Sequence, residues 1–179
     1  MEQPLQQIVG LARAQGFEFV ATTTADQLEA REEVRAMCAA DTCHAYGKSW
    51  SCPPAAGTLD EFRERIASYR DVVVFETVME LEDEFDFETM MEAEQVHKQR
   101  LEALVGEARG VAPDCLPLGV GTCSVCPECT YPGEPCRFPE RQIVSMEAAG
   151  LVVSDVCKAA SVAYNHGSDH ICYVSCILL

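Results

Sequence analysis

The chain has 179 residues, of which 48% are hydrophobic, and its 13 basic and 29 acidic side chains give a formal net charge of −16. This charge disfavours nucleic-acid binding, because affinity for a phosphate backbone rests largely on Lys and Arg contacts. No apolar run approaches the ~20 residues of a membrane-spanning helix, and the first residues lack the basic start and apolar core of a signal peptide. We therefore expect a globular cytoplasmic protein that binds neither nucleic acid nor membrane, with an oligomeric state that the sequence does not predict.

The N-terminal segment predicts a helix and a strand before a charged stretch. Residues 3–15 are expected to form a helix, because apolar side chains recur along one stripe and Gly16 follows. Residues 17–23 have the composition of a strand. Residues 25–37 are charged and ambiguous, although residues 34–37 are compatible with a short strand.

A capping box and two apolar runs mark the middle of the chain. The segment Thr58-Leu-Asp-Glu61 has the capping-box form, so we expect a helix to begin there. Residues 71–79 predict a buried strand. The eight carboxylates of residues 80–94 lead into a long predicted helix at about residues 88–110, whose apolar side chains recur at helical spacing.

The C-terminal part combines irregular structure with short elements. Residues 112–144 contain many Pro, Gly and Cys residues and are expected to be irregular. Short helices are predicted at residues 145–149 and 154–161, each capped by its first Ser. Residues 171–179 predict a terminal strand.

These elements predict an α+β fold in a single domain over residues 1–179. Helices would cover a small mixed sheet, and two long cysteine-bearing metal loops, at about residues 38–57 and 119–144, would lie at its end.

The second loop carries the stronger metal-binding pattern. Four cysteines follow one another as C-x2-C-x2-C-x6-C, namely Cys123, Cys126, Cys129 and Cys136. Thiols stay reduced in the cytoplasm, so clustered cysteines there indicate metal or redox chemistry rather than disulfides. The C-x2-C-x2-C beginning is also that of bacterial ferredoxins, which predicts an iron–sulfur cluster, most naturally of the 4Fe–4S type. Zinc is the alternative, although four-cysteine zinc sites usually draw on two separated pairs.

The first loop holds three cysteines in a looser pattern, Cys38, Cys43 and Cys52. Three thiolates predict a second metal site with one open or non-cysteine position, where a substrate, a small ligand or a side chain would bind. Candidates for a fourth protein ligand are His44, Cys115 and His97. The alternative is that two of the three thiols are small buried apolar groups.

The remaining cysteines are interpreted as structural. Cys172 and Cys176 share one face of the terminal strand with their Cα atoms roughly 13 Å apart, so one ion cannot bind both. Cys157 lies on a predicted helix and is assigned to the core.

Three histidines and three loop residues have alternative roles. His97 lies on the apolar stripe of the long helix, as a hydrogen-bonded core residue or else as a ligand or proton carrier. His166 and His170 flank a predicted turn and receive surface or supporting roles. Three further residues lie inside the cysteine loops, where cations would raise a cluster's potential and an indole would shield it or anchor the loop: Lys48, Arg137 and Trp50.

Two stretches resemble a family of small prokaryotic proteins of unknown function described as predicted metal-binding proteins. One runs from Cys38 through Cys43-His-Ala-Tyr-Gly-Lys-Ser-Trp-Ser-Cys52-Pro-Pro, and the other is Gly121-Thr-Cys-Ser-Val-Cys-Pro-Glu-Cys-Thr-Tyr-Pro-Gly-Glu-Pro-Cys136-Arg-Phe-Pro, followed by Ser145-Met-Glu-Ala-Ala-Gly150. The resemblance implies metal binding by these cysteines and names no reaction.

Together, the patterns predict a cytosolic iron–sulfur protein with one four-cysteine cluster and a second three-cysteine site. Its work would be electron transfer to a protein redox partner, or redox or ligand chemistry at the open position. Two alternatives are a zinc-stabilised protein-interaction module and a metallochaperone that uses the first group. The sequence shows no nucleophile–base pattern, phosphate loop or dinucleotide fingerprint, so it names no reaction.

Overall fold

The structure is a computed structural model that describes residues 2–179. Its helices are α1 (Glu2–Ala14), α2 (Glu32–Ala39), α3 (Leu59–Ala67), α4 (Phe87–Val111) and α5 (Val153–Ala159), with short 3-10 turns η1 (Ala25–Gln27) and η2 (Pro139–Arg141). Its strands are β1 (Phe19–Thr24), β2 (Asp71–Glu80), β3 (Leu116–Gly119), β4 (Val144–Ser145) and β5 (His170–Leu178).

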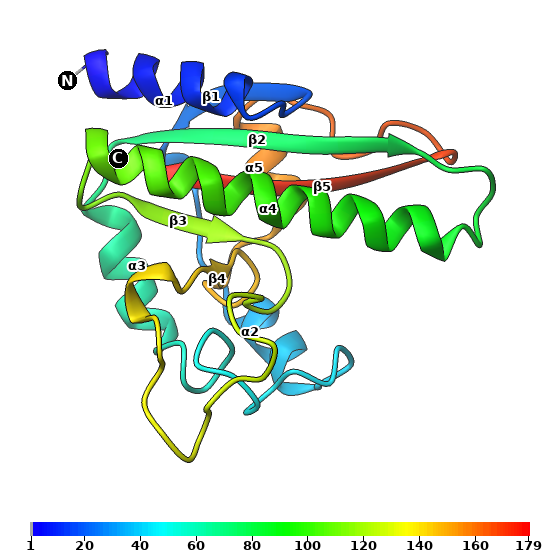
Figure 1. Cartoon of the computed structure of the whole chain (residues 1–179). Helices are drawn as coiled ribbons and strands as arrows, with labels where there is room; N and C mark the ends of the chain where they lie inside the picture. Colours follow the sequence, from blue (N-terminus) through cyan, green and yellow to red (C-terminus); the bar gives the residue numbers. More distant parts are fainter. Residues whose placement is uncertain (1) are drawn as a thin grey trace.

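The strands form one five-stranded sheet in the order β1-β2-β5-β3-β4. All neighbours are antiparallel except β3 and β4, which run parallel, so the sheet is mixed. Helix α4 runs along one side of the sheet, while α5 lies behind it (Figure 1). The predicted α+β class, a small mixed sheet covered by helices, is confirmed.

Alternating side chains of the central strands build a core on each face of the sheet, because successive residues of a strand point to opposite faces. Val73 and Phe75 pack with residues of α1 and α4. Val72 and Val74 pack with residues of α3 and α5.

Local sequence signals predicted several elements correctly. Thr58 caps α3 with its side-chain oxygen, which accepts a hydrogen bond from the Glu61 N–H at 3.2 Å, and the Glu61 carboxylate accepts from the Thr58 N–H at 2.7 Å. This is the reciprocal capping box that the sequence predicted. The long helix and the strands β1, β2 and β5 also lie where they were expected.

Three short predictions were wrong. Residues 34–37 belong to helix α2, whose first turn carries Glu32 and Glu33, a favourable placement for negative charge at a helix N-terminus. No helix forms at residues 145–149, because Ser145 belongs to strand β4, which pairs with β3, and residues 146–149 form a turn. Helix α5 begins at Val153, so Ser154 is not its cap.

Strand β3 was missed inside the segment expected to be irregular. It is only four residues long and contains Pro117, a residue that disfavours strand assignment. It pairs with β5, and its partner β4 forms the edge of the sheet.

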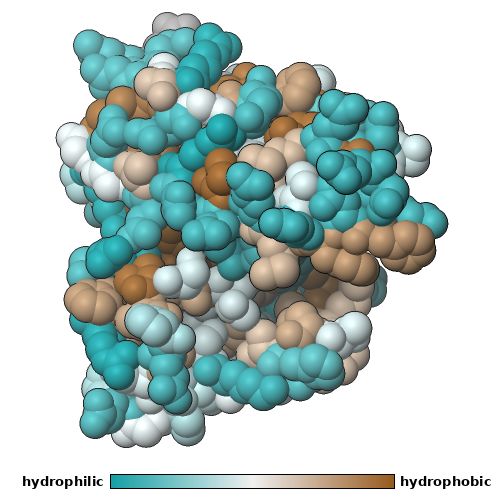
Figure 2. All heavy atoms as spheres, turned by 45° about the vertical axis from the view of Figure 1, so that its right-hand side comes forward, coloured by the Kyte–Doolittle hydropathy of each residue, from teal (hydrophilic) through white to brown (hydrophobic). Residues whose placement is uncertain are grey.

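The two cysteine-bearing segments lie together beyond this edge. One begins at Cys38, in the last turn of α2, and continues to α3, while the other connects β3 to β4. Both run through the same lower part of the molecule (Figure 1). A hollow separates this part from the sheet and α4 above it (Figure 2). Among the described residues, no helix combines the length and apolar character needed to cross a membrane.

Candidate metal centre

The second cysteine loop begins at a glycine-dependent turn that leaves the sheet. Gly119 ends β3, and a Cβ there would meet a Leu101 methyl carbon at 2.9 Å. Gly121 has φ +56°, in the left-handed region that glycine adopts without strain. These two residues let the chain pass close to α4 and turn directly into Cys123.

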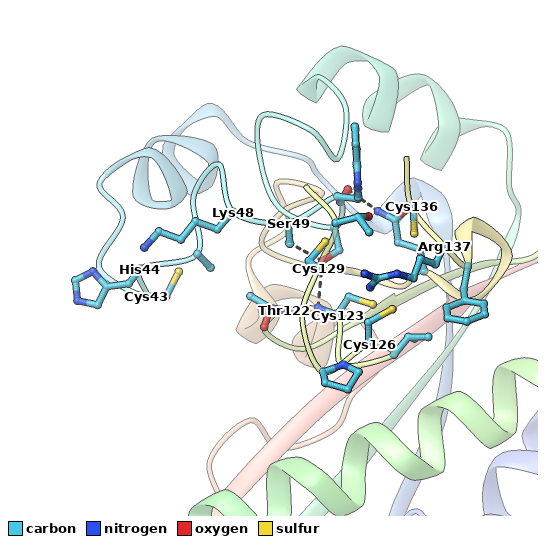
Figure 3. Close-up of a pocket in the computed structure, with 18 residues that line it drawn as sticks. Cys43, His44, Lys48, Ser49, Thr122, Cys123, Cys126, Cys129, Cys136 and Arg137 are labelled. Atoms are coloured by element: carbon cyan, nitrogen blue, oxygen red, sulfur yellow. Dashed lines mark hydrogen bonds between the residues drawn. The ribbon is translucent and has the colours of Figure 1, made fainter. Parts of the chain in front are cut away.

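All four cysteines of this loop line one cavity of about 330 Å³. In Figure 3, the side chains of Cys123, Cys126 and Cys129 gather near the centre, and Cys136 lies to one side next to Arg137. Cys129 is exposed, whereas the other three are half-buried. The structure therefore brings to one solvent-accessible space the four thiols that the spacing grouped together.

The first loop forms one wall of this cavity. Ser51 is buried, and its hydroxyl accepts a hydrogen bond from the Cys123 N–H at 3.1 Å. The Trp50 indole N–H donates to the Glu134 carbonyl at 3.1 Å, and its ring meets the Tyr131 ring edge-on at 5.0 Å. Trp50 thus anchors the two loops to each other.

Two cations identified in the sequence also line this cavity, Lys48 and Arg137. The Arg137 guanidinium donates to the Glu128 carbonyl at 2.8 Å, which holds it across the second loop. Both side chains therefore bring positive charge to the space that the four thiols line.

The three cysteines of the first loop line a neighbouring cavity of about 470 Å³. Cys52 is buried, Cys38 is half-buried, and Cys43 is exposed and lines both cavities. Burial raises the pKa of the Cys38 thiol; the Arg35 charge opposes this rise, and the charges of Glu147, Cys43 and Cys52 add to it. The three thiols therefore share one cavity whose surroundings disfavour the charged form of Cys38.

The candidate fourth ligands of the first group lie elsewhere. His44 lines the four-cysteine cavity rather than this one. His97 is fully buried, and its two ring nitrogens engage the hydroxyls of Thr77 and Ser175. Cys115 is buried in the core between the sheet and α4.

Sequence reasoning missed two carboxylates that line the first-group cavity, Glu94 of α4 and Glu147 of the turn after β4. The backbone carbonyl of Glu147 also accepts a hydrogen bond from the Cys38 thiol at 3.8 Å. Neither carboxylate is near a cysteine in sequence, so only the folded chain reveals them. Their carboxylate oxygens are additional potential metal ligands beside the three thiols.

The loop thiols are spread more widely than a single ion requires. Within residues 2–179, no three of the seven loop thiols have their sulfur atoms all within 4.8 Å of one another. A tetrahedral zinc ion with Zn–S bonds of about 2.3 Å would place its sulfur ligands about 3.8 Å apart. The loop thiols therefore do not already form the ligand shell of a single ion.

Comparison with known proteins identifies the family of this chain. Residues 22–179, which include both cysteine groups, match the family model described as Predicted metal-binding protein (DUF2284). No curated protein and no solved structure matches the chain. The match covers most of the sequence, and the chain belongs to the DUF2284 family of predicted metal-binding proteins.

Proposed function

We propose that this protein is a cytoplasmic iron–sulfur protein that binds a 4Fe–4S cluster through Cys123, Cys126, Cys129 and Cys136. One observation supports the proposal most strongly. The three cysteines of the ferredoxin-like C-x2-C-x2-C run and the downstream Cys136 line a single cavity. No three of these sulfur atoms all lie within 4.8 Å of one another, so they do not already form the shell of a single ion.

The surrounding residues would tune such a cluster. A bound 4Fe–4S cluster supplies one-electron redox chemistry, with a potential that depends on nearby charge, hydrogen bonds and solvent exposure. Lys48 and Arg137 bring positive charge to the cavity. The Ser51 hydroxyl fixes the backbone at Cys123. The exposed Cys129 lies where electrons would enter or leave.

The second part of the proposal concerns Cys38, Cys43 and Cys52. Three thiolates would leave one position of a metal centre open to a small ligand or substrate. Because Cys43 lines both cavities, this centre would be adjacent to the cluster. Adjacent centres favour transfer of electrons between a protein redox partner, the cluster and the open site.

Metal and sulfide analysis of anaerobically purified protein tests the proposal. We expect a brown protein with iron and acid-labile sulfide in near-stoichiometric amounts. Cys126→Ala should remove one cluster's worth of both. Cys43→Ala should lower metal content at the first site while the four-cysteine cluster remains.

Cys176→Ala is the matched control, because Cys176 is fully buried in the core and lines neither cavity. It should leave iron and sulfide unchanged. A colourless anaerobic preparation containing zinc and no sulfide would contradict the proposal and would favour the zinc-stabilised interaction module. Weak, exchangeable metal confined to the first group would instead favour the metallochaperone.

A further inference from the structure

A second cluster of metal-binding side chains lies in the sheet, away from the cysteine loops. Glu76 of β2, His166 of the segment after α5 and Cys172 of β5 each place one ligand atom within 4.8 Å of the other two. None of these three residues lines either of the two cavities at the cysteine loops. The cluster is therefore distinct from both loop cavities.

The sheet register explains how Glu76 and Cys172 meet. Glu76 pairs with Val174, and Cys172 pairs with Val78, so the two side chains are diagonal neighbours on one face of an antiparallel pair. Such neighbours are within reach of each other's side chains. The face is the one covered by α5, and the chain that leaves α5 brings His166 over the carboxylate.

Burial of Glu76 is the unusual feature of this cluster. Its carboxylate is 0% exposed in the middle of an apolar strand. Its Oε2 atom lies 3.0 Å from Nε2 of His166, and its Oε1 atom accepts a hydrogen bond from the Cys157 thiol at 3.6 Å. A buried carboxylate is costly unless it is paired or coordinates a metal.

The three ligand atoms also have the chemistry and nearly the spacing of a transition-metal site. Thiolate sulfur, imidazole nitrogen and carboxylate oxygen are all zinc ligands, and bonds of about 2.0–2.3 Å place ligand atoms about 3.3–3.8 Å apart in a tetrahedral shell. The imidazole nitrogen of His166 and a carboxylate oxygen of Glu76 already lie 3.0 Å apart, and the Cys172 sulfur lies within 4.8 Å of a ligand atom of each.

We propose that Glu76, His166 and Cys172 bind a single divalent transition-metal ion such as Zn²⁺. Cys157 supports the carboxylate from its other oxygen, and Phe19 stacks on the His166 ring with centroids 4.8 Å apart, which fixes the imidazole. Three protein ligands leave a fourth position for water or a small ligand, as in zinc sites with an open coordination position. The proposal does not depend on the assignment of the loop cysteines.

Titration of the full chain with Co²⁺, with the loop metal retained and air excluded, tests the site. We expect one Co²⁺ to bind with a thiolate-to-cobalt charge-transfer band, and Zn²⁺ to displace it. Cys172→Ala should abolish the band. Removing a residue that only hydrogen-bonds to a metal ligand weakens metal affinity about 10- to 100-fold. Removing the ligand Cys172 itself should therefore weaken binding at least tenfold. His166→Gln, in an irregular segment outside the core, should weaken it similarly.

Two controls separate this site from the loops. Cys176→Ala removes a thiol from the same strand and face, roughly 13 Å from Cys172, and should leave the cobalt signal intact. Cys126→Ala should lower loop iron while the cobalt signal remains. Equal cobalt uptake and spectra in the unmodified chain, Cys172→Ala and His166→Gln would overturn the proposal and leave only a buried His–Glu pair. A signal lost in Cys126→Ala alone would also overturn it.

Discussion

At the scale of single residues, His97 shows how a histidine becomes part of the core. Its side chain is fully buried and lies 3.0 Å from the Thr77 hydroxyl and 2.7 Å from the Ser175 hydroxyl. Burial lowers the pKa of His97 to about 3, with smaller contributions from the charges of Arg100 and Lys98. The imidazole is therefore neutral at neutral pH, as a hydrogen-bonded core residue.

This histidine should make the fold sensitive to acid. Its folded pKa of about 3 is below the unfolded value of about 6.5, so below pH 6.5 the unfolded chain binds a proton that the folded chain does not. The free energy of unfolding should fall by up to about 1.4 kcal/mol per pH unit from this group, between about pH 6.5 and pH 3. Urea unfolding at a series of pH values measures the slope.

His97→Gln should reduce that slope, whatever it does to stability at neutral pH. His170→Gln is the control, because the His170 side chain is only partly buried, at 32% exposure, and pairs with the exposed Asp169. The Glu18 carboxylate, paired with Arg100 at 3.0 Å, and the Tyr173 phenol near the His97 ring stay in place in both variants. Equal slopes in the original chain and His97→Gln would show that the histidine is not the acid-sensitive group.

At the scale of elements, prediction succeeded where a local signal decided the structure. The capping box at Thr58 and the apolar run of β2 needed no distant partner. Prediction failed for α2, β3 and β4, whose form depends on tertiary contacts: β4 is only two residues long and exists because β3 lies beside it. Propensity is a weak guide for such short segments.

For the candidate site too, the sequence predicted local features and missed those that depend on tertiary contacts. Cysteine spacing grouped four thiols of the second loop, and these line one cavity, but it did not indicate that Cys43 of the first group lines the same cavity. It did not reveal the contact between the loops, since Ser51 and Cys123 are 72 residues apart. Glu76 did leave a signal: a lone carboxylate in the apolar run of β2 lies on the same strand face as Val72 and Val74.

Gly150 is an element-scale test of the turn that follows β4. It has φ +87°, and a Cβ there would collide with a side-chain methyl of Leu59 on α3. Its carbonyl also accepts a hydrogen bond from the Arg31 N–H at 2.8 Å. Gly150→Ala should therefore destabilise the fold by about 1–3 kcal/mol through backbone strain and the collision. Chemical unfolding measures the loss.

Gly106→Ala provides the matched comparison. Gly106 lies within α4, and a Cβ added there would have nothing within 4 Å. Alanine is favoured over glycine in a helix by about 1 kcal/mol, so this variant should be neutral or more stable. If both variants unfold at the same denaturant concentration, then a side chain at position 150 does not destabilise the fold, and the prediction from backbone strain and collision is wrong.

At the scale of the whole molecule, the core and the cysteine loops are separate structural units. The two apolar clusters flank the sheet, and neither includes any of the seven loop cysteines. A chain of this size buries roughly 70% of its unfolded surface, enough for a core that needs no metal. Metal in the loops would then order the loops and not the sheet, unlike a zinc finger, which unfolds without its ion.

Metal removal should therefore separate two spectroscopic signals. Trp50 is the only tryptophan, and it joins the loops through the Glu134 carbonyl and the Tyr131 ring. Chelation should shift its fluorescence toward that of a solvated indole, because the loops are released, while the far-ultraviolet circular dichroism of the helices and sheet is retained. Cys126→Ala should reproduce the fluorescence change without a chelator, and Cys176→Ala should not. If the circular dichroism collapsed together with the fluorescence, the loops would be holding the sheet together, and the separation of core from metal site would be wrong.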